Sequence, residues 1–195
     1  MDIGVGNFLD KVGRHFGLGF PAGPEIEKLA KGGSYVELPY YIKGMDVSFS
    51  GMQTKLQQLY DKASDKEKIK RDLAFSMQET AFAMLIEAAE RAMAHTGKKE
   101  LVLGGGVACN SRLQEMCKIM CQERGAKFFC PERGLLVDNA AMIAFTGEII
   151  LQSKAPQSLQ QNDLLKVLNS GIKESADKVE VKPRERTDEV SVSWR

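Results

Sequence analysis

The chain has 195 residues, of which 43% are hydrophobic and 27% charged, and its 27 basic and 26 acidic side chains leave a net charge of +1. This length is sufficient to bury a substantial hydrophobic core, and the composition is ordinary for a globular protein. The balanced charge argues against a strongly basic nucleic-acid surface, so any nucleic-acid contact is local or delegated to a partner. No apolar run approaches the roughly 20 residues of a membrane-spanning helix.

Helical periodicity dominates the first hundred residues. Apolar side chains at helical spacing predict helices at residues 7–16, 25–30, 52–60 and 64–95. Ser64 and Glu67 have the spacing of a capping box at the start of the last helix. The second half of that helix is apolar on nearly every side, which predicts that this half is buried. Residues 35–42 predict an irregular or edge segment, because Pro39 interrupts a strand-like composition, and residues 47–51 predict a short strand that ends in a turn.

The next part of the chain is organised around residues 101–110, with the sequence LVLGGGVACN. They predict a short buried strand and a glycine turn, followed by a helix over residues 111–124. A second strand over residues 126–130 completes a βαβ unit, which predicts parallel pairing. The glycines allow a ligand to approach the backbone closely. The start of the helix is expected to offer unpaired N–H groups, which suit a phosphate or carboxylate. Asn110 stands at the N-cap position, so its side chain serves the helix, a ligand or both.

The glycine turn does not identify a ligand by itself. Its spacing matches neither GxGxxG nor GxxxxGK[ST]. A nucleotide site and a tight structural turn therefore both remain open, because glycines at such a position also permit close packing of a helix on a strand.

The four cysteines lie within residues 109–130 and include no C-x-x-C pair. Cys117 and Cys121 are about one helical turn apart, a spacing that suits a metal. Free cysteine nevertheless usually packs as a small core residue, and no histidine lies nearby. We therefore favour core positions and a reducing compartment, cytosol or nucleus. His15 and His95 form no His-x-x-x-His or HExxH pair, so no complete metal site is predicted.

Asp138 follows a predicted loop over residues 131–137 and precedes a predicted helix that ends near residue 151. Two interpretations of this carboxylate remain open. It is either the N-cap of the helix or a ligand to a metal that lies beside a nucleotide.

Several blocks of the sequence, taken together, resemble one family. They are residues 2–7 (DIGVGN), 36–40 (VELPY), 43–51 (KGMDVSFSG), 78–80 (QET), 105–110 (GGVACN), 123–126 (ERGA), 137–144 (VDNAAMIA) and 186–190 (RTDEV). The chain is similar to the tRNA N6-adenosine threonylcarbamoyltransferases, in the archaeal and eukaryotic branch once described as O-sialoglycoprotein endopeptidases. The blocks keep the family's order along the whole chain.

The resemblance implies an α/β fold. The expected architecture is the RNase H-like C-terminal lobe of an actin-like ATPase, with extra helices and with the N-terminal lobe missing. Residues 1–153 then form this lobe with its entry helix, and residues 154–195 form a polar, partly mobile C-terminal tail. The missing lobe carries the family's His-x-x-x-His metal ligands. Ala22 and Ala140 stand where the family is expected to have glycine.

The resemblance also implies a reaction. Family members move threonylcarbamoyl from threonylcarbamoyl-adenylate to N6 of the tRNA adenosine 3′ of the anticodon, in a complex with a small atypical kinase and accessory subunits. The expected ligands are ATP or threonylcarbamoyl-adenylate and a divalent metal, iron or zinc, whose site is incomplete in this chain. The expected partners are tRNA, those subunits and a separate N-terminal lobe, with no membrane. The expected location is the cytoplasm, and also the nucleus in a eukaryote.

Site residues follow from the same resemblance, position by position. The matching positions are Asp10, Gly23, Glu27 and Asn110 for substrate binding and Asp138 for the metal. The glycine turn, through Gly105 and Gly106, joins Asn110 in holding the adenylate. No catalytic residue is assigned.

Two other functions are weighed against this one. The alternative is a non-catalytic lobe that keeps the fold and acts as an interaction scaffold within the complex. Another actin-like phosphotransferase, such as a sugar or acetate kinase, is disfavoured by residues 105–110 and 137–144.

Overall fold

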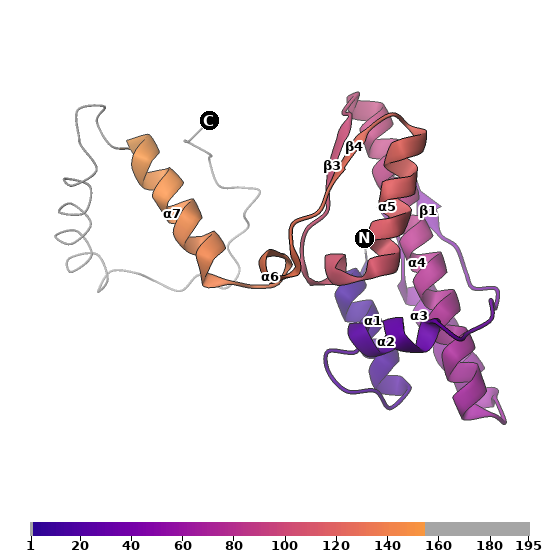
Figure 1. Cartoon of the computed structure of the whole chain (residues 1–195). Helices are drawn as coiled ribbons and strands as arrows, with labels where there is room; N and C mark the ends of the chain where they lie inside the picture. The colour runs from indigo at the N-terminus through magenta and orange to yellow at the C-terminus, as the bar shows by residue number, and fades with distance from the viewer. Residues whose placement is uncertain (1, 155–195) are drawn as a thin grey trace. The chain divides into compact units, whose positions relative to one another are not determined.

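The computed structural model describes residues 2–154 (Figure 1). The chain divides into two compact units, Met1–Asp138 and Asn139–Arg195. The elements of the first unit are α1 (Val5–His15), α2 (Gly23–Ala30), β1 (Ile42–Lys43), β2 (Asp46–Val47), α3 (Ser50–Lys62), α4 (Lys66–Thr96), β3 (Glu100–Val102), the 3-10 helix η1 (Gly106–Cys109), α5 (Ser111–Glu123), β4 (Lys127–Phe129) and α6 (Arg133–Leu136); α7 (Ala140–Lys154) lies in the second. The expected polar tail over residues 154–195 lies almost entirely outside the described residues.

The described chain is helix-rich and contains two small sheets, β1–β2 and β3–β4. The predicted βαβ unit is confirmed, since β3 and β4 pair in parallel on either side of α5 in the sequence. The expected α/β architecture therefore holds for the βαβ unit. Outside the βαβ unit, most of the regular secondary structure is helical. Among residues 2–154, no helix is both long enough and apolar enough to cross a membrane.

The long helix α4 is the central element of the first unit. In Figure 1, α1, α2 and α3 lie beside its N-terminal half, and α5 with the β3–β4 pair lies beside the other half. Asp65 is its N-cap and accepts a hydrogen bond from the Lys68 N–H at 2.9 Å. The helix ends at Gly97, whose φ of +67° is a conformation that glycine adopts without strain.

Two predictions about α4 are wrong. The capping box at Ser64 and Glu67 does not form, because Asp65, an equally good cap one residue later, takes the N-cap position. The buried part of the helix is its middle, from Leu73 to Met84, rather than its second half. The second half is only partly buried because it carries Glu87, Glu90 and Arg91 among its apolar residues. These charges pair at the surface, as the 2.5 Å Arg91–Glu87 contact shows.

One hydrophobic core joins α1, α2, α3 and the middle of α4. Its largest members are fully buried side chains from all four helices and from the segment before α3: Phe8, Phe16, Ile26, Phe49, Met52, Leu56, Leu73, Met77 and Met84. The rings of Phe8 and Phe49 stack with their centroids 5.2 Å apart, which ties α1 to the start of α3. This core fixes α1 and α2, the two helices that carry the expected carboxylate ligands.

The β3–β4 pair partly buries one face and exposes the other. Leu101 and Phe128 are register partners and pack against the α4 and α5 side chains. Val102 and Phe129, the next partners along, are 68% and 47% exposed. The expectation of a fully buried strand is therefore wrong for this chain. The three-residue strand alternates its side chains between faces, and within the described first unit only one face packs against helices.

Asp2 anchors the N-terminal segment to the start of α3. The helix has no side-chain cap from its own N-cap residue, Phe49. Asp2 takes that role from a distance, accepting hydrogen bonds from the Phe49 and Ser50 N–H groups at 3.0 Å and from the Ser48 hydroxyl at 2.9 Å. Desolvation by the surrounding chain raises the pKa of Asp2, but the hydrogen bonds from Ser50, Phe49 and Ser48 outweigh it and lower the pKa well below its usual range.

We predict that Asp2 makes stability depend on pH in the acid range. Its pKa is lower in the folded state than the ordinary value of about 4 in the unfolded chain, so its contribution is present above about pH 4 and is lost as the pH falls below it. Replacing Asp2 by Ala costs on the order of 1 kcal/mol at pH 7, the usual value of a helix cap. Urea unfolding at pH 7 and pH 3 measures the difference between wild type and variant.

That difference in the free energy of unfolding shrinks at pH 3. Asp2→Asn is the matched control, because it keeps an acceptor oxygen without a titrating charge. A gap between wild type and Asp2→Ala that stays the same at both pH values would contradict the prediction.

Candidate functional site

A cavity of about 440 Å³ lies in the first unit beside the glycine turn. Five of the residues predicted to bind nucleotide or substrate line it: Asp10, Gly23, Glu27, Gly106 and Asn110. They come from α1, α2, η1 and the residue before α5. Gly105, the sixth, immediately precedes η1, and Asp138, the expected metal ligand, lies outside the lining. The fold thus brings together residues that are far apart in the sequence, while their binding roles stay predictions.

The glycine turn leaves open space rather than a packed contact. Gly105 has a φ of +88°, which a residue with a side chain rarely adopts. A Cβ built on Gly104, Gly105 or Gly106 meets no atom within 4 Å. Close packing of the helix on the strand is therefore not the reason for these glycines. The open backbone beside the cavity favours the other interpretation, approach of a ligand.

Asp10 holds the loop that forms one wall of the cavity. Its Oδ1 accepts a hydrogen bond from the Ala22 N–H at 2.8 Å, at the N-cap of α2. Among the described residues it makes no second side-chain hydrogen bond. The other carboxylate oxygen therefore keeps its capacity to accept a hydrogen bond from a ligand hydroxyl or amine.

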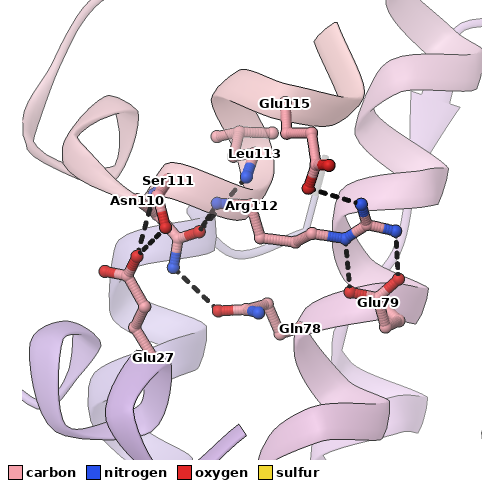
Figure 2. Close-up of polar contacts among 8 residues, drawn as sticks. All are labelled: Glu27, Gln78, Glu79, Asn110, Ser111, Arg112, Leu113 and Glu115. Carbon is pink, nitrogen blue, oxygen red and sulfur yellow. Dashed lines mark hydrogen bonds and ion pairs between the residues drawn. The ribbon is translucent and has the colours of Figure 1, made fainter. Parts of the chain in front are cut away.

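Glu27 connects α2 to the beginning of α5. Its Oε1 accepts hydrogen bonds from the Ser111 N–H at 2.9 Å and from the Ser111 hydroxyl (Figure 2). Like Asp10, Glu27 uses one oxygen within the protein, and the described residues supply no partner for Oε2. The two carboxylates thus combine a structural contact with one free acceptor each.

Asn110 is the N-cap of α5, as predicted. Its Oδ1 accepts hydrogen bonds from the Arg112 and Leu113 N–H groups at 2.9 and 3.2 Å, and its Nδ2 donates to Oε1 of the buried Gln78 at 2.8 Å (Figure 2). Asn110 is 8% exposed. In this conformation the amide serves the protein through both of its polar atoms. Its role as a direct ligand stays a prediction.

The N-terminus of α5 does not offer unpaired N–H groups, so that expectation is wrong. Asn110 and Glu27 satisfy the first three N–H groups of the helix, and the Gln114 N–H donates to the Asn110 carbonyl at 3.2 Å. A helix start leaves its first N–H groups without partners inside the helix. Here the chain's own side chains fill that role before any anion does.

An ion-pair group lies on the other side of this helix start. Arg112 makes two 2.8 Å hydrogen bonds to the carboxylate of Glu79 on α4 and a third to Glu115 (Figure 2). These hydrogen bonds, that to Glu79 above all, raise the pKa of Arg112 above its ordinary value. A second cavity, of about 470 Å³, borders these residues and also Glu27. Glu27 therefore lines both cavities.

Two of the four cysteines take core positions and a third lines the cavity. Cys117 and Cys121 are buried in apolar clusters, as favoured from the sequence. Burial raises the pKa of Cys117 to about 11, with smaller contributions from Cys121 and Cys130, so its thiol is neutral at physiological pH. Cys109 lines the candidate cavity.

Asp138 does not fit a resident metal by itself. It is exposed, and among residues 2–154 no three His, Cys, Asp or Glu side chains come together as a group that could hold a metal ion. A single carboxylate is too few ligands for a tight site. Asn139, rather than Asp138, caps α7 by accepting a hydrogen bond from the Met142 N–H at 2.9 Å.

The sequence did not predict α6 or its contribution to the cavity. Residues 131–137 were expected to form a loop, but Arg133–Leu136 form a short helix, and Arg133 and Val137 line the cavity. A helix of one turn is too short for periodicity to reveal. Among the lining residues Arg133 alone carries a positive charge.

The alanine at position 22 fits because its neighbour is a glycine. A Cβ on Gly13 would lie 2.2 Å from the Cβ of Ala22, which is 1% exposed. The methyl group that the family resemblance did not predict at position 22 therefore occupies space left by Gly13. Ala140, the other unexpected alanine, is the first residue of α7.

A helix-rich domain with one βαβ unit and a cavity beside its glycine turn is typical of domains that bind small molecules. A family model described as tRNA N6-adenosine threonylcarbamoyltransferase matches residues 1–145. The chain belongs to this family.

Relatives with the same description are similar over the whole chain. Those from Thermococcus kodakarensis and Methanocella arvoryzae are 50% and 49% identical over all 195 residues, which is 54% of each relative. A protein from Methanocorpusculum labreanum, described as a probable bifunctional tRNA threonylcarbamoyladenosine biosynthesis protein, is 47% identical over the same residues, 33% of its length. The chain spans about half the length, or less, of these relatives.

We predict that Gly13→Ala destabilises the wall that Asp10 and Ala22 form. Overpacking of this kind costs roughly 1–3 kcal/mol. The double variant Gly13→Ala with Ala22→Gly recovers most of that loss, because it moves the methyl group to the other side of the same contact. Urea unfolding measures both variants. Gly51→Ala is the control, since a Cβ there meets nothing within 4 Å, and equal stability of the single and double variants would contradict this account.

We also predict that the two polar atoms of Asn110 contribute separately to stability. Asn110→Ala removes the cap and leaves Oε1 of Gln78 buried without a partner, at a cost of roughly 2–3 kcal/mol. Asn110→Asp keeps the cap, and the Gln78 amide can turn to present its N–H₂ group, so this variant loses less. Chemical unfolding of the two variants tests the order, and equal losses would show that the cap contributes nothing.

Proposed function

We propose that this chain supplies the nucleotide-binding part of a transferase that moves threonylcarbamoyl from threonylcarbamoyl-adenylate to N6 of the tRNA adenosine 3′ of the anticodon. Membership of the family supports the reaction. The observation that carries the proposal for this chain is the arrangement of Asp10, Gly23, Glu27, Gly106 and Asn110 around one cavity. In this proposal the architecture is the C-terminal lobe of an actin-like ATPase.

The cavity offers the contacts that a nucleoside requires. One part of the wall is apolar and consists of Leu9, Pro21 and Val107, against which a base can pack. Asp10 and Glu27 each keep one carboxylate oxygen as an acceptor for ribose hydroxyls or the amine of the base. These residues bind and orient the nucleotide, so the contribution of this chain to the reaction is to place the adenylate.

The metal requires donors from outside the described residues. The lone, exposed Asp138 is proposed as one ligand at most. The proposed partners are tRNA, the small atypical kinase, the accessory subunits and an N-terminal lobe. A net charge of +1 gives the chain little overall attraction for tRNA, so in this proposal the partners supply much of that contact.

One observation favours the alternative, a non-catalytic interaction lobe. Val102, Phe129 and Leu135 in the first unit are 68%, 47% and 53% exposed. Exposed apolar side chains of this size mark contact surfaces when they form a patch. A scaffold would keep these contacts without binding a nucleotide, so nucleotide binding distinguishes the two functions.

Calorimetric titration of the whole chain with ATP, with and without the N-terminal lobe of a relative, tests the proposal. We predict binding that Asp10→Asn weakens roughly tenfold, because the neutral side chain keeps the contact to Ala22 but loses a charged acceptor. Asp72→Asn is the matched control: Asp72 also accepts one backbone N–H at 2.8 Å, from Ser34, and lies outside the cavity lining.

The outcomes separate the functions. Binding by the chain alone means that it forms a working half-site, and binding only with the added lobe means that the site is shared. No binding in either case would support the scaffold. Equal affinities of Asp10→Asn and wild type would remove Asp10 from the site.

A further inference from the structure

The charges that line the candidate cavity are unbalanced for a phosphate. Asp10 and Glu27 are both acidic, and they repel an anion. The first N–H groups of α5, which a phosphate commonly uses at a helix start, are taken by Asn110 and Glu27. An adenylate in this cavity therefore needs a positive charge from elsewhere.

Arg133 is in the right place to supply it. It lines the cavity together with Gly106 and Val107 of η1. Leu136, at the other end of α6, is buried and anchors the helix, and α6 packs against η1. Arg133 is exposed, but the short helix that carries it is held beside the glycine turn.

The guanidinium is also available. Among the described residues Arg133 forms neither an ion pair nor a side-chain hydrogen bond. By contrast, Arg91, Arg112 and Arg124 each pair with a glutamate at 2.5 to 3.0 Å. Arg133 lines the same cavity as two carboxylates but pairs with neither. It therefore keeps all five of its N–H donors for a ligand.

We infer that Arg133 binds the phosphate of a nucleotide in this cavity and so determines a preference for nucleotides over nucleosides. The inference rests on the proposed function, because it assumes that the cavity takes an adenine nucleotide. A guanidinium presents two parallel N–H donors to two phosphate oxygens, which is the geometry that arginine offers and lysine does not. In the bound state Asp10 and Glu27 hold the nucleoside, and Arg133 neutralises the phosphate.

Titration of the whole chain with AMP and with adenosine tests this inference. The two ligands differ only in the phosphate. We predict that Arg133→Gln weakens AMP binding about tenfold or more and leaves adenosine affinity unchanged. Arg133→Lys, which keeps the charge but not the paired donors, falls between Gln and wild type. The affinity of wild type for AMP also falls more steeply with added salt than that of Arg133→Gln.

Arg14→Gln is the matched control. Arg14 lies on α1, is exposed and does not line the cavity, so this variant removes the same charge elsewhere. It should bind both ligands as wild type does, which excludes an effect of net charge alone. Thermal unfolding of every variant checks that the fold is retained.

The remaining outcomes overturn one idea or the other. If Arg133→Gln binds AMP as tightly as wild type does, or loses affinity for AMP and adenosine equally, Arg133 does not bind the phosphate. If wild type binds neither AMP nor adenosine, even with the added N-terminal lobe of a relative, the proposed function itself fails.

Discussion

The position of the cavity depends on a small polar junction where α2, α4 and α5 meet. At the start of α5, Ser111 donates hydrogen bonds to Glu27 from α2, and Asn110 donates one to Gln78 from α4 (Figure 2). The Asn110–Gln78 contact is buried, and a buried polar atom without a partner costs roughly 1–3 kcal/mol. The junction therefore admits few alternative arrangements. Because it fixes α2 against α5, it also fixes the distance between the carboxylate wall and the glycine turn.

This junction changes what each expected ligand can do. Asp10 and Glu27 use one oxygen to hold the protein together and keep the other, whereas Asn110 uses both its oxygen and its nitrogen. The Asn110 nitrogen carries a second N–H, which no contact among the described residues uses, whereas its oxygen already accepts two hydrogen bonds. A ligand therefore meets one remaining donor at Asn110 and one remaining acceptor oxygen on each carboxylate. Glu27 also borders the second cavity, so the two cavities share one side chain.

The sequence predicts the helices well because periodicity and glycine are local signals. It fails where neighbouring residues compete or where tertiary contacts decide. Asp65 rather than Ser64 caps α4, and one turn of helix at Arg133 leaves no periodic trace. The strand at Val102 looks buried in the sequence, yet burial depends on what covers the sheet. Only the family resemblance groups Asp10 with Asn110, since no local pattern connects them.

In the proposed function, the described residues of this chain contribute recognition of the nucleotide. They supply carboxylate acceptors, an apolar wall and an open glycine turn around one cavity. A metal that polarises the reacting group needs several ligands in a fixed geometry, and Asp138 alone does not provide them in the described residues. In this proposal, binding of the nucleotide and activation of the reacting group rest on different sets of residues. In this proposal, changes at Asp10 or Arg133 alter which ligand binds. A metal that accelerates the reaction needs several ligands, and residues 2–154 do not bring together a group of side chains that could supply them.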